Sequence, residues 1–219
     1  ITMNRPAARN ALSSEVLKLL PALMKTADKD DSVDVIILTG TDPAFCAGLD
    51  LKELGDTAGN LSGTGADGSP NAQGVRGPFP PLTKPLIAAV NGAAVTGGLE
   101  LALACDFIVA SVNAKFADTH LRVGVYPGPV VVDLPRKVGA AKAAEMSLTG
   151  DFVDATTALR IGLANHVVPH SELIPTAMRI AESIAEQDPV MVAAIREEWK
   201  YLNTLPLHEA REEHLRNAA

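Results

Sequence analysis

The segment Pro85–Leu99 constrains the fold more than any other part of this chain, because it is strongly apolar and carries no charge. It is shorter than the ~20 residues that a helix needs to cross a bilayer, and it contains polar residues and glycines, so it indicates core rather than membrane. Leu86–Val90 predicts a strand buried on both faces, and Asn91–Thr96 predicts a loop. Gly97–Cys105 then predicts a helix that is apolar almost all round and therefore buried. This succession is typical of an α/β domain.

The rest of the chain alternates short apolar runs with helical patterns and ends in a helical third. Further strands or extended pieces are predicted at 34–40, 106–110, 115–117, 123–125 and 165–168. Helices are predicted at 12–28, from about residue 50, at 140–147 and 154–161, and in two C-terminal stripes that each end at a proline. We therefore expect one α/β core over residues 1–165 and a helical region over 166–219. The chain starts in a strand pattern and stops in a helical one, so we also expect a missing edge at each end.

Charge balance and cysteine content exclude several classes of function. The 19 Lys and Arg residues against 26 Asp and Glu residues give a formal net charge of −7, whereas a nucleic-acid-binding protein needs a basic face. Two cysteines are too few for a disulfide scaffold, and the histidines have no spacing typical of a metal site. No targeting pattern is visible at the start of the chain. These features lead us to expect a cytoplasmic protein that binds no metal.

Residues 55–81 are rich in Gly, Ser, Asn and Pro, and predict a surface loop. The loop contains a literal G-x-G-x-x-G at 63–68. A dinucleotide-binding motif needs a strand before it and a helix after it, and neither is predicted here. We therefore exclude a dinucleotide site.

Two predicted junctions, near Gly48-Leu49 and near Gly97-Gly98, have a buried strand, a glycine turn and then a helix start. The first N–H groups of a helix lack partners within it and lie at the positive end of its dipole. If the two junctions face each other, one N–H from each can stabilise a developing oxyanion.

Glu100 is the one ionisable residue in the buried helix predicted at 97–105. One interpretation is that the carboxylate complements the helix dipole. The other is that Glu100 is a catalytic acid or base. Residue spacing alone leaves both open.

Three segments together resemble a known family. Ala44–Glu53, Lys84–Leu101, and 147–150 with 158–164 are similar, in this order, to the three signatures of the crotonase family, the enoyl-CoA hydratases and isomerases. The resemblance implies a spiral of ββα units, with C-terminal helices that help to form a homotrimer or a dimer of trimers. It also implies an acyl-CoA thioester as substrate, so coenzyme A is part of the substrate and no separate cofactor is expected.

The resemblance also implies roles for individual residues. The thioester oxygen is expected between the backbone N–H groups of Leu49 and Gly97, and Glu100 is expected to be one acid/base. The remaining residues implied by the resemblance line the coenzyme A channel; they are Ala47, Asp50, Leu51 and Lys52.

The sequence departs from the family pattern at the second acid/base, which is a carboxylate in the family's hydratases and aligns with His120 here. His120 can serve as the second acid/base, since an imidazole titrates near neutral pH. Alternatively Glu100 acts alone, or turnover is lost, or His120 is a loop histidine facing solvent. Asp118, two residues earlier, can orient His120 or replace it.

The activity that the resemblance implies first is hydration of a 2-enoyl-CoA. Double-bond isomerisation by Glu100 alone is the second candidate, and acyl-CoA binding without turnover is the third.

Overall fold

Parallel strands of apolar residues form the central sheet of the molecule. The computed structural model describes residues 1–50, 52–53 and 78–217. The sheet has the order β1-β2-β4-β6-β9, with every neighbouring pair parallel. Its strands are β1 (Thr2–Met3), β2 (Ile36–Gly40), β4 (Leu86–Val90), β6 (Phe107–Ser111) and β9 (His166–Val168). The predicted strands at 34–40, 86–90, 106–110 and 165–168 are thus confirmed to within two residues.

A second sheet has the order β3-β5-β7-β8. It consists of β3 (Ala44–Cys46), β5 (Ala93–Val95), β7 (Lys115–Ala117) and β8 (Val153–Asp154), with only the β7–β8 pair antiparallel among the described strands. Three times the chain passes from a strand of the first sheet through a short turn into a strand of the second. The sequence predicts β7 but not β3, β5 or β8. Two or three residues show almost no alternating pattern, so strands of this length are predicted only in part.

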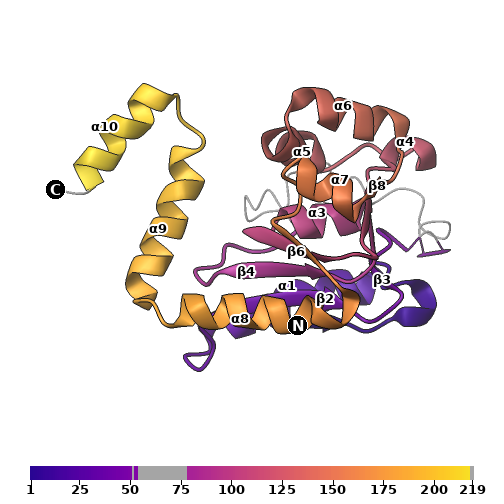
Figure 1. The fold of residues 1–219 in the computed structure, drawn as a ribbon, viewed down its shortest axis with the longest axis horizontal. Helices are drawn as coiled ribbons and strands as arrows, with labels where there is room; N and C mark the ends of the chain where they lie inside the picture. Colours follow the sequence, from indigo (N-terminus) through magenta and orange to yellow (C-terminus); the bar gives the residue numbers. More distant parts are fainter. Residues whose placement is uncertain (51, 54–77, 218–219) are drawn as a thin grey trace.

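The helices follow the strands and cover the sheets (Figure 1). Among the described residues they are α1 (Ser14–Lys29), α3 (Gly97–Leu103), α4 (His120–Val123), α5 (Val130–Val138), α6 (Ala140–Thr149), α7 (Ala155–Arg160), α8 (Leu173–Ala185), α9 (Pro189–Leu202) and α10 (Leu207–Asn217), with 3-10 turns at Pro6–Ala8 and His170–Glu172. None of the described helices is long and apolar enough to cross a membrane.

Most predicted helices are confirmed, and three local predictions are wrong. The loop predicted at 91–96 contains strand β5, which pairs with β3 and β7. The predicted extended piece at 123–125 is instead the end of α4, which Gly124 closes in the left-handed conformation. Residues 130–138, for which the sequence pattern predicts no helix, form α5. The helix predicted from residue 50 is seen at 52–53, and most of the loop predicted at 55–81 lies outside the described residues.

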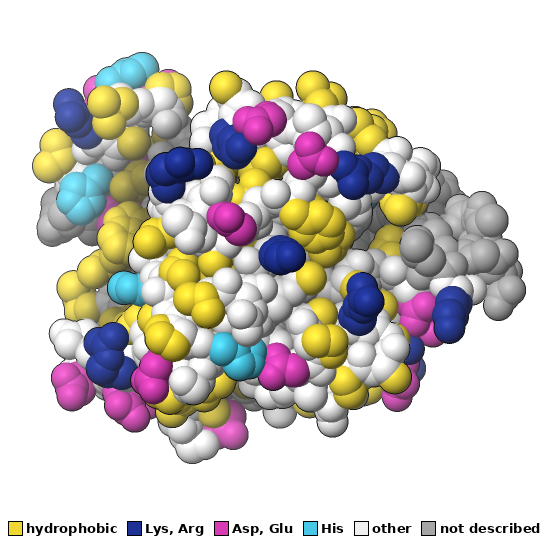
Figure 2. Space-filling model, turned by 45° about the vertical axis from the view of Figure 1, so that its right-hand side comes forward, with side chains coloured by type: hydrophobic (Ala, Val, Ile, Leu, Met, Phe, Trp, Pro, Cys, Tyr) yellow, Lys and Arg dark blue, Asp and Glu magenta, His cyan; other side chains and the backbone are white. Residues whose placement is uncertain are grey.

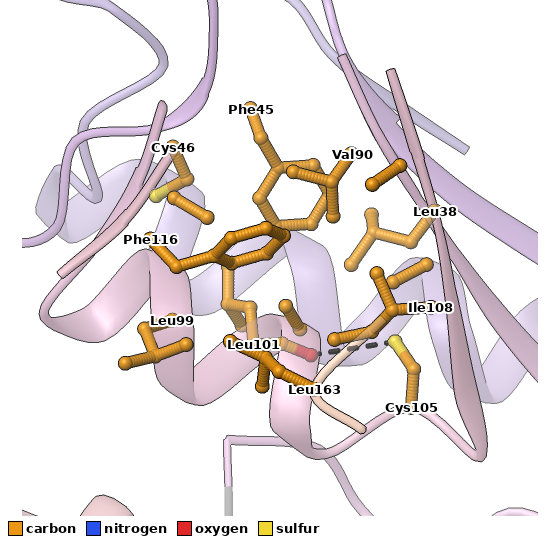
Figure 3. Packing of buried hydrophobic residues seen from close by; sticks show 14 of the residues in the cluster. Leu38, Phe45, Cys46, Val90, Leu99, Leu101, Cys105, Ile108, Phe116 and Leu163 are labelled. Atoms are coloured by element: carbon orange, nitrogen blue, oxygen red, sulfur yellow. Dashed lines mark hydrogen bonds between the residues drawn. The ribbon is translucent and has the colours of Figure 1, made fainter. Parts of the chain in front are cut away.

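Two apolar clusters cover the two faces of the central sheet. In β4 every residue is buried. Leu86, Ala88 and Val90 belong to the larger cluster, whereas Ile87 and Ala89 belong to a smaller one with α8. This alternation follows from the two-residue period of a strand. Figure 3 shows the larger cluster, in which Phe45 and Phe116 of the second sheet lie among side chains of the first sheet and of α3.

Helices α9 and α10 project from the body of the molecule, whereas α8 packs along the central sheet (Figure 1). The division at residue 165 therefore stays a prediction. One buried contact fixes α9. Arg196 Nε lies 2.6 Å from Asp106 Oδ2, and the guanidinium also donates to the carbonyl of Leu82.

We expect Arg196→Ala to lower the free energy of unfolding by about 3 kcal/mol, because it leaves the Asp106 carboxylate without its charged partner, with only the Leu86 N–H still donating to it. Arg179→Ala removes an exposed arginine of α8 and should change the stability by less than about 0.5 kcal/mol. Urea denaturation of both variants measures the difference. Equal stability of the two variants would show that the contact does not hold α9.

Candidate active site

Leu49 and Gly97 lie side by side where strand β3 and helix α3 meet. A Cβ atom built on Gly97 would lie 3.9 Å from the backbone nitrogen of Leu49. The residues flanking Leu49 bond to Leu12, since Leu12 N–H donates to the Gly48 carbonyl (2.8 Å) and Asp50 N–H donates to the Leu12 carbonyl (3.1 Å). The N–H of Leu49 therefore points away from Leu12. In the part of the chain that the structure describes, neither this N–H nor that of Gly97 has an acceptor. Two adjacent free N–H groups are what an oxyanion hole requires.

Glycines make this close approach possible. Gly48 has φ of +89°, which is the left-handed region that other residues avoid. A Cβ atom on Gly98 would lie 2.1 Å from the carbonyl oxygen of Cys46. Helix α3 thus lies against β3 at a distance that only glycine permits.

Glu100 lies one turn into α3, and its side chain is 14% exposed. One carboxylate oxygen, Oε1, accepts from the backbone N–H of Val130 at 3.3 Å. A Cβ atom on Gly128 would lie 2.9 Å from the same oxygen. The start of α5 therefore holds the Glu100 carboxylate in place. The sequence does not predict this role for residues 128–130.

His120 begins α4 and is only 4% exposed, so the interpretation of a solvent-facing histidine is wrong. Its Nδ1 atom lies 2.6 Å from Asp118 Oδ1, and its Nε2 atom lies 3.9 Å from Glu100 Oε1. Asp118 therefore lies on the Nδ1 side, with Glu100 on the Nε2 side. Of the two predicted roles of Asp118, orienting His120 fits this geometry, whereas replacing it does not.

Asp118 has a second partner, Ser147, which the sequence does not indicate as a site residue. The hydroxyl of Ser147, near the end of α6, donates to Asp118 Oδ2 at 2.6 Å. Ser147 stands in the third family-like segment, but nothing in the sequence indicates that this segment meets Asp118, because 29 positions separate them.

The two carboxylates of the site have pKa values shifted in opposite directions. Burial raises the pKa of Glu100, and this effect exceeds the lowering by the Val130 N–H and by His120. Burial also acts on Asp118, but the hydrogen bonds from His120 and Ser147 outweigh it and hold the pKa of Asp118 below its ordinary value. Asp118 is thus the fixed anion of the site, and Glu100 is the group suited to proton transfer.

The residues expected to line the coenzyme A channel are brought only partly together. Asp50 forms an ion pair with Arg5 at 3.1 Å, which gives its carboxylate a local structural partner. Lys52 is exposed and Ala47 is half-buried. Leu51 lies outside the described residues. Their role in binding stays a prediction.

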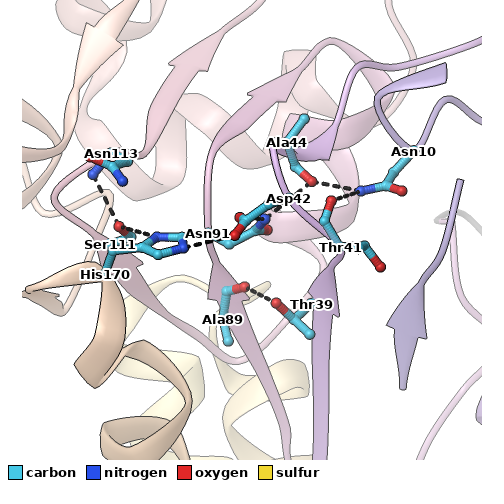
Figure 4. Close-up of polar contacts among 10 residues, drawn as sticks. All are labelled: Asn10, Thr39, Thr41, Asp42, Ala44, Ala89, Asn91, Ser111, Asn113 and His170. Atoms are coloured by element: carbon cyan, nitrogen blue, oxygen red, sulfur yellow. Dashed lines mark hydrogen bonds and ion pairs between the residues drawn. The ribbon is translucent and has the colours of Figure 1, made fainter. Parts of the chain in front are cut away.

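Other polar side chains have structural partners. Figure 4 shows His170 between Ser111 and Asp42, with Nδ1 and Nε2 each 3.0 Å from an oxygen, and Asn91 donating to Asp42. These contacts join the ends of the central strands. Burial raises the pKa of the Cys46 thiol to about 12, which does not suit a nucleophile. Among the described residues no three His, Cys, Asp or Glu side chains are placed to share a metal ion.

The fold and the site define a class of protein: an α/β domain with strands alternating between two sheets, in which two neighbouring backbone N–H groups lie at the start of the helix that carries Glu100. The family model for enoyl-CoA hydratase/isomerase matches residues 1–218. The chain therefore belongs to the enoyl-CoA hydratase/isomerase family.

Individual relatives agree with this assignment. The chain is 42% identical to the probable enoyl-CoA hydratase 1, peroxisomal, of Arabidopsis thaliana over 90% of this chain and 72% of that protein. The crystal structure of an enoyl-CoA hydratase from Mycobacterium avium is 47% identical, with a TM-score of 0.80 over 92% of this chain and 83% of that one. A monofunctional enoyl-CoA isomerase from M. smegmatis is 32% identical, with a TM-score of 0.77 over 96% of this chain and 91% of that one.

We expect Gly98→Ala to lower stability by more than about 3 kcal/mol, because the new methyl group meets backbone at β3. Gly128→Ala is the matched control, since its methyl group meets only the movable carboxylate end of Glu100 and should leave the melting temperature within a few degrees. Thermal unfolding of both variants checks this. A stable Gly98→Ala protein would show that α3 and β3 are not held at this separation.

Proposed function

We propose that this protein is an enoyl-CoA hydratase, which adds water across the double bond of a 2-enoyl-CoA thioester. The observation that carries the proposal is the distance of 3.9 Å between Glu100 Oε1 and His120 Nε2. This separation is too long for a direct hydrogen bond, but one water oxygen can lie ~2.8 Å from both atoms. The names of the relatives support the same activity.

The two free N–H groups would supply the electrostatic part of the reaction. When water attacks C3 of the enoyl group, negative charge moves to the thioester oxygen. Donation from Leu49 and Gly97 stabilises this enolate, and losing one such donor costs ~10²-fold or more in rate.

Glu100 and His120 would supply the proton transfers. One of the pair removes a proton from water as the C3–O bond forms, and the other delivers a proton to C2 as the enolate collapses, which gives the 3-hydroxyacyl-CoA. Because Glu100 and His120 lie on the same side of the substrate in this scheme, the hydroxyl group and the proton add to the same face of the double bond. The active form holds one exchangeable proton shared by the pair.

The substrate carries coenzyme A, so no further cofactor takes part in this scheme. We propose that Ala47, Asp50, Leu51 and Lys52 contact the coenzyme A portion.

We also propose a homotrimer or a dimer of trimers. Support comes from large apolar side chains left exposed on the projecting helices: Val190, Met191, Ile195, Trp199, Leu207 and Leu215. On the face drawn in Figure 2, Lys and Arg side chains are separated by acidic and apolar ones, so this face has no continuous basic area for nucleic acid. The buried free thiols of Cys46 and Cys105 suit the cytoplasm, which remains our proposed compartment.

Isomerisation is the second candidate, favoured by the burial of Glu100 and by the structural likeness to the isomerase. It requires one base to move one proton between carbons, and so predicts little dependence on His120. Binding without turnover is the third possibility.

The first test follows the loss of enoyl-thioester absorbance with crotonyl-CoA. We expect Glu100→Gln and His120→Ala each to reduce kcat by ~10²–10⁴-fold, because each removes one of the two proton-transfer groups. Lys142→Ala removes a lysine of α6 whose ion-pair partner is Glu145, outside the Glu100–His120–Asp118 contacts, and should retain full rate. Loss of hydration in Glu100→Gln alone, with isomerase activity kept in His120→Ala, would favour the isomerase. Binding of the thioester by the parent protein without turnover on either substrate would overturn both enzymatic proposals.

The pH dependence gives a further test. Burial raises the pKa of Glu100, so its carboxyl group keeps a proton to higher pH than an ordinary glutamate. We expect kcat/KM to follow a bell-shaped curve, falling at low pH as the pair takes up a second proton and at high pH as the shared proton is lost. In Glu100→Gln the residual activity should follow a single titration. An unchanged two-sided curve in this variant would exclude Glu100 as one of the titrating groups.

A further inference from the structure

We propose that Asp118 and Ser147 are positioning residues that fix the ring orientation and tautomer of His120, so that Nε2 is the nitrogen presented to Glu100 and to substrate. The kinetic part of this inference rests on the proposed function. The tautomer itself can be measured without substrate, so the two proposals fail separately.

Asp118 contacts His120 twice, on the Nδ1 side of the ring and at the backbone. Its Oδ1 atom lies 2.6 Å from His120 Nδ1 and 3.4 Å from the backbone nitrogen of the same residue. An ionised carboxylate only accepts hydrogen bonds, so Nδ1 must carry a hydrogen. In the neutral imidazole, Nε2 is then the free base. The low pKa of Asp118 keeps this acceptor ionised at neutral pH.

Ser147 fixes the carboxylate in turn. Its hydroxyl donates to Oδ2 at 2.6 Å, so each oxygen of Asp118 has its own donor. Asp118 is 1% exposed and has no room to turn toward solvent. The carboxylate plane is therefore set by α6 on one side and by the imidazole on the other.

Helix α6 is itself docked against α4. Arg122 of α4 donates to the carbonyl oxygen of Thr149 (2.9 Å) and to Asp151 Oδ1 (2.5 Å), just beyond the end of α6. This contact occupies the one arginine of α4, so it does not compete with His120 for Asp118. It also keeps Ser147 within reach of the carboxylate.

The opposite end of the imidazole ring faces the reacting groups. Nε2 lies 3.9 Å from Glu100 Oε1, and that oxygen is held by the N–H of Val130. The chain of contacts runs from α6 through Asp118 and His120 to Glu100 and ends at the start of α5. The resulting geometry leaves one nitrogen and one carboxylate able to exchange a proton across a gap that fits a water.

The decisive measurement is the tautomer of His120, read from the ¹⁵N chemical shifts of histidine-labelled protein, with His120→Gln used to assign the signal. We expect the parent protein to carry the hydrogen on Nδ1. Asp118→Asn presents an amide that can donate to Nδ1, and should move the hydrogen to Nε2. In this variant kcat for crotonyl-CoA should fall by ~10²-fold or more, with KM changed less than kcat.

Ser147→Ala tests the outer contact in a milder variant, in case Asp118→Asn fails to fold. Loss of one hydrogen bond should reduce kcat by about 3- to 10-fold, because the carboxylate is held less firmly, and should leave the hydrogen on Nδ1, since Asp118 Oδ1 is still its acceptor. Ser147→Thr keeps the hydroxyl and should restore the rate. Thr149→Ala is the matched control, because it removes another hydroxyl from the last turn of α6, one that donates to the Glu145 carbonyl and accepts from the Asp151 N–H, without contacting Asp118. The Thr149 carbonyl that Arg122 contacts is backbone and is kept in this variant.

A parent protein with the hydrogen on Nε2, or an Asp118→Asn variant with unchanged tautomer and kcat, would overturn the proposal. Equal rates in Ser147→Ala and Thr149→Ala would remove Ser147 from it. If the tautomer changes as expected but the parent protein does not hydrate crotonyl-CoA, the positioning role stands and the proposed function fails.

Discussion

The close approach of helix α3 to strand β3 is the constraint on which the site depends. Gly98 lies so near the Cys46 carbonyl that no side chain fits between them. This approach brings the N–H of Gly97 next to that of Leu49. It also places Glu100, one turn further along α3, in the interior of the molecule. The proposed oxyanion stabilisation and the proposed acid/base thus depend on one packing contact. A wider separation would lose both, since free N–H groups act on a single oxygen only when they converge.

The architecture explains why residues distant in sequence meet here. Strands of the central sheet lead by short turns into the second sheet, so β3, β5 and β7 deliver the segments that follow them to one side. Leu49 follows β3, Gly97 follows β5, and His120 follows β7. Each pass of the chain thereby adds one element of the site. The helices α5 and α6 then close over it from residues that come later in the chain.

The parts of this arrangement that have strong local signals can be predicted from the sequence. The fully buried strand β4 and the all-apolar helix with Glu100 are visible in single segments, and the crotonase resemblance indicated Leu49, Gly97 and His120. The three-residue strands β3 and β5 were missed because their pairing partners, and not their own pattern, define them. Ser147 and the N–H of Val130 were missed for a related reason. Their importance comes from contacts with Asp118 and Glu100 across about 30 residues of sequence, which no local pattern encodes.

The charge of the site explains why an imidazole can stand where the family pattern has a carboxylate. Two carboxylates sharing one proton carry one net negative charge. Glu100 and His120 sharing one proton carry none, so the replacement by itself removes a charge from beside the substrate. Asp118 restores it, because its hydrogen bonds with His120 and Ser147 keep it ionised although it is buried. In the proposed scheme the proton-sharing pair and the Asp118 anion therefore form one unit, with the net charge that the two-carboxylate arrangement would have. The imidazole at position 120 is a workable substitution here because Asp118 accompanies it.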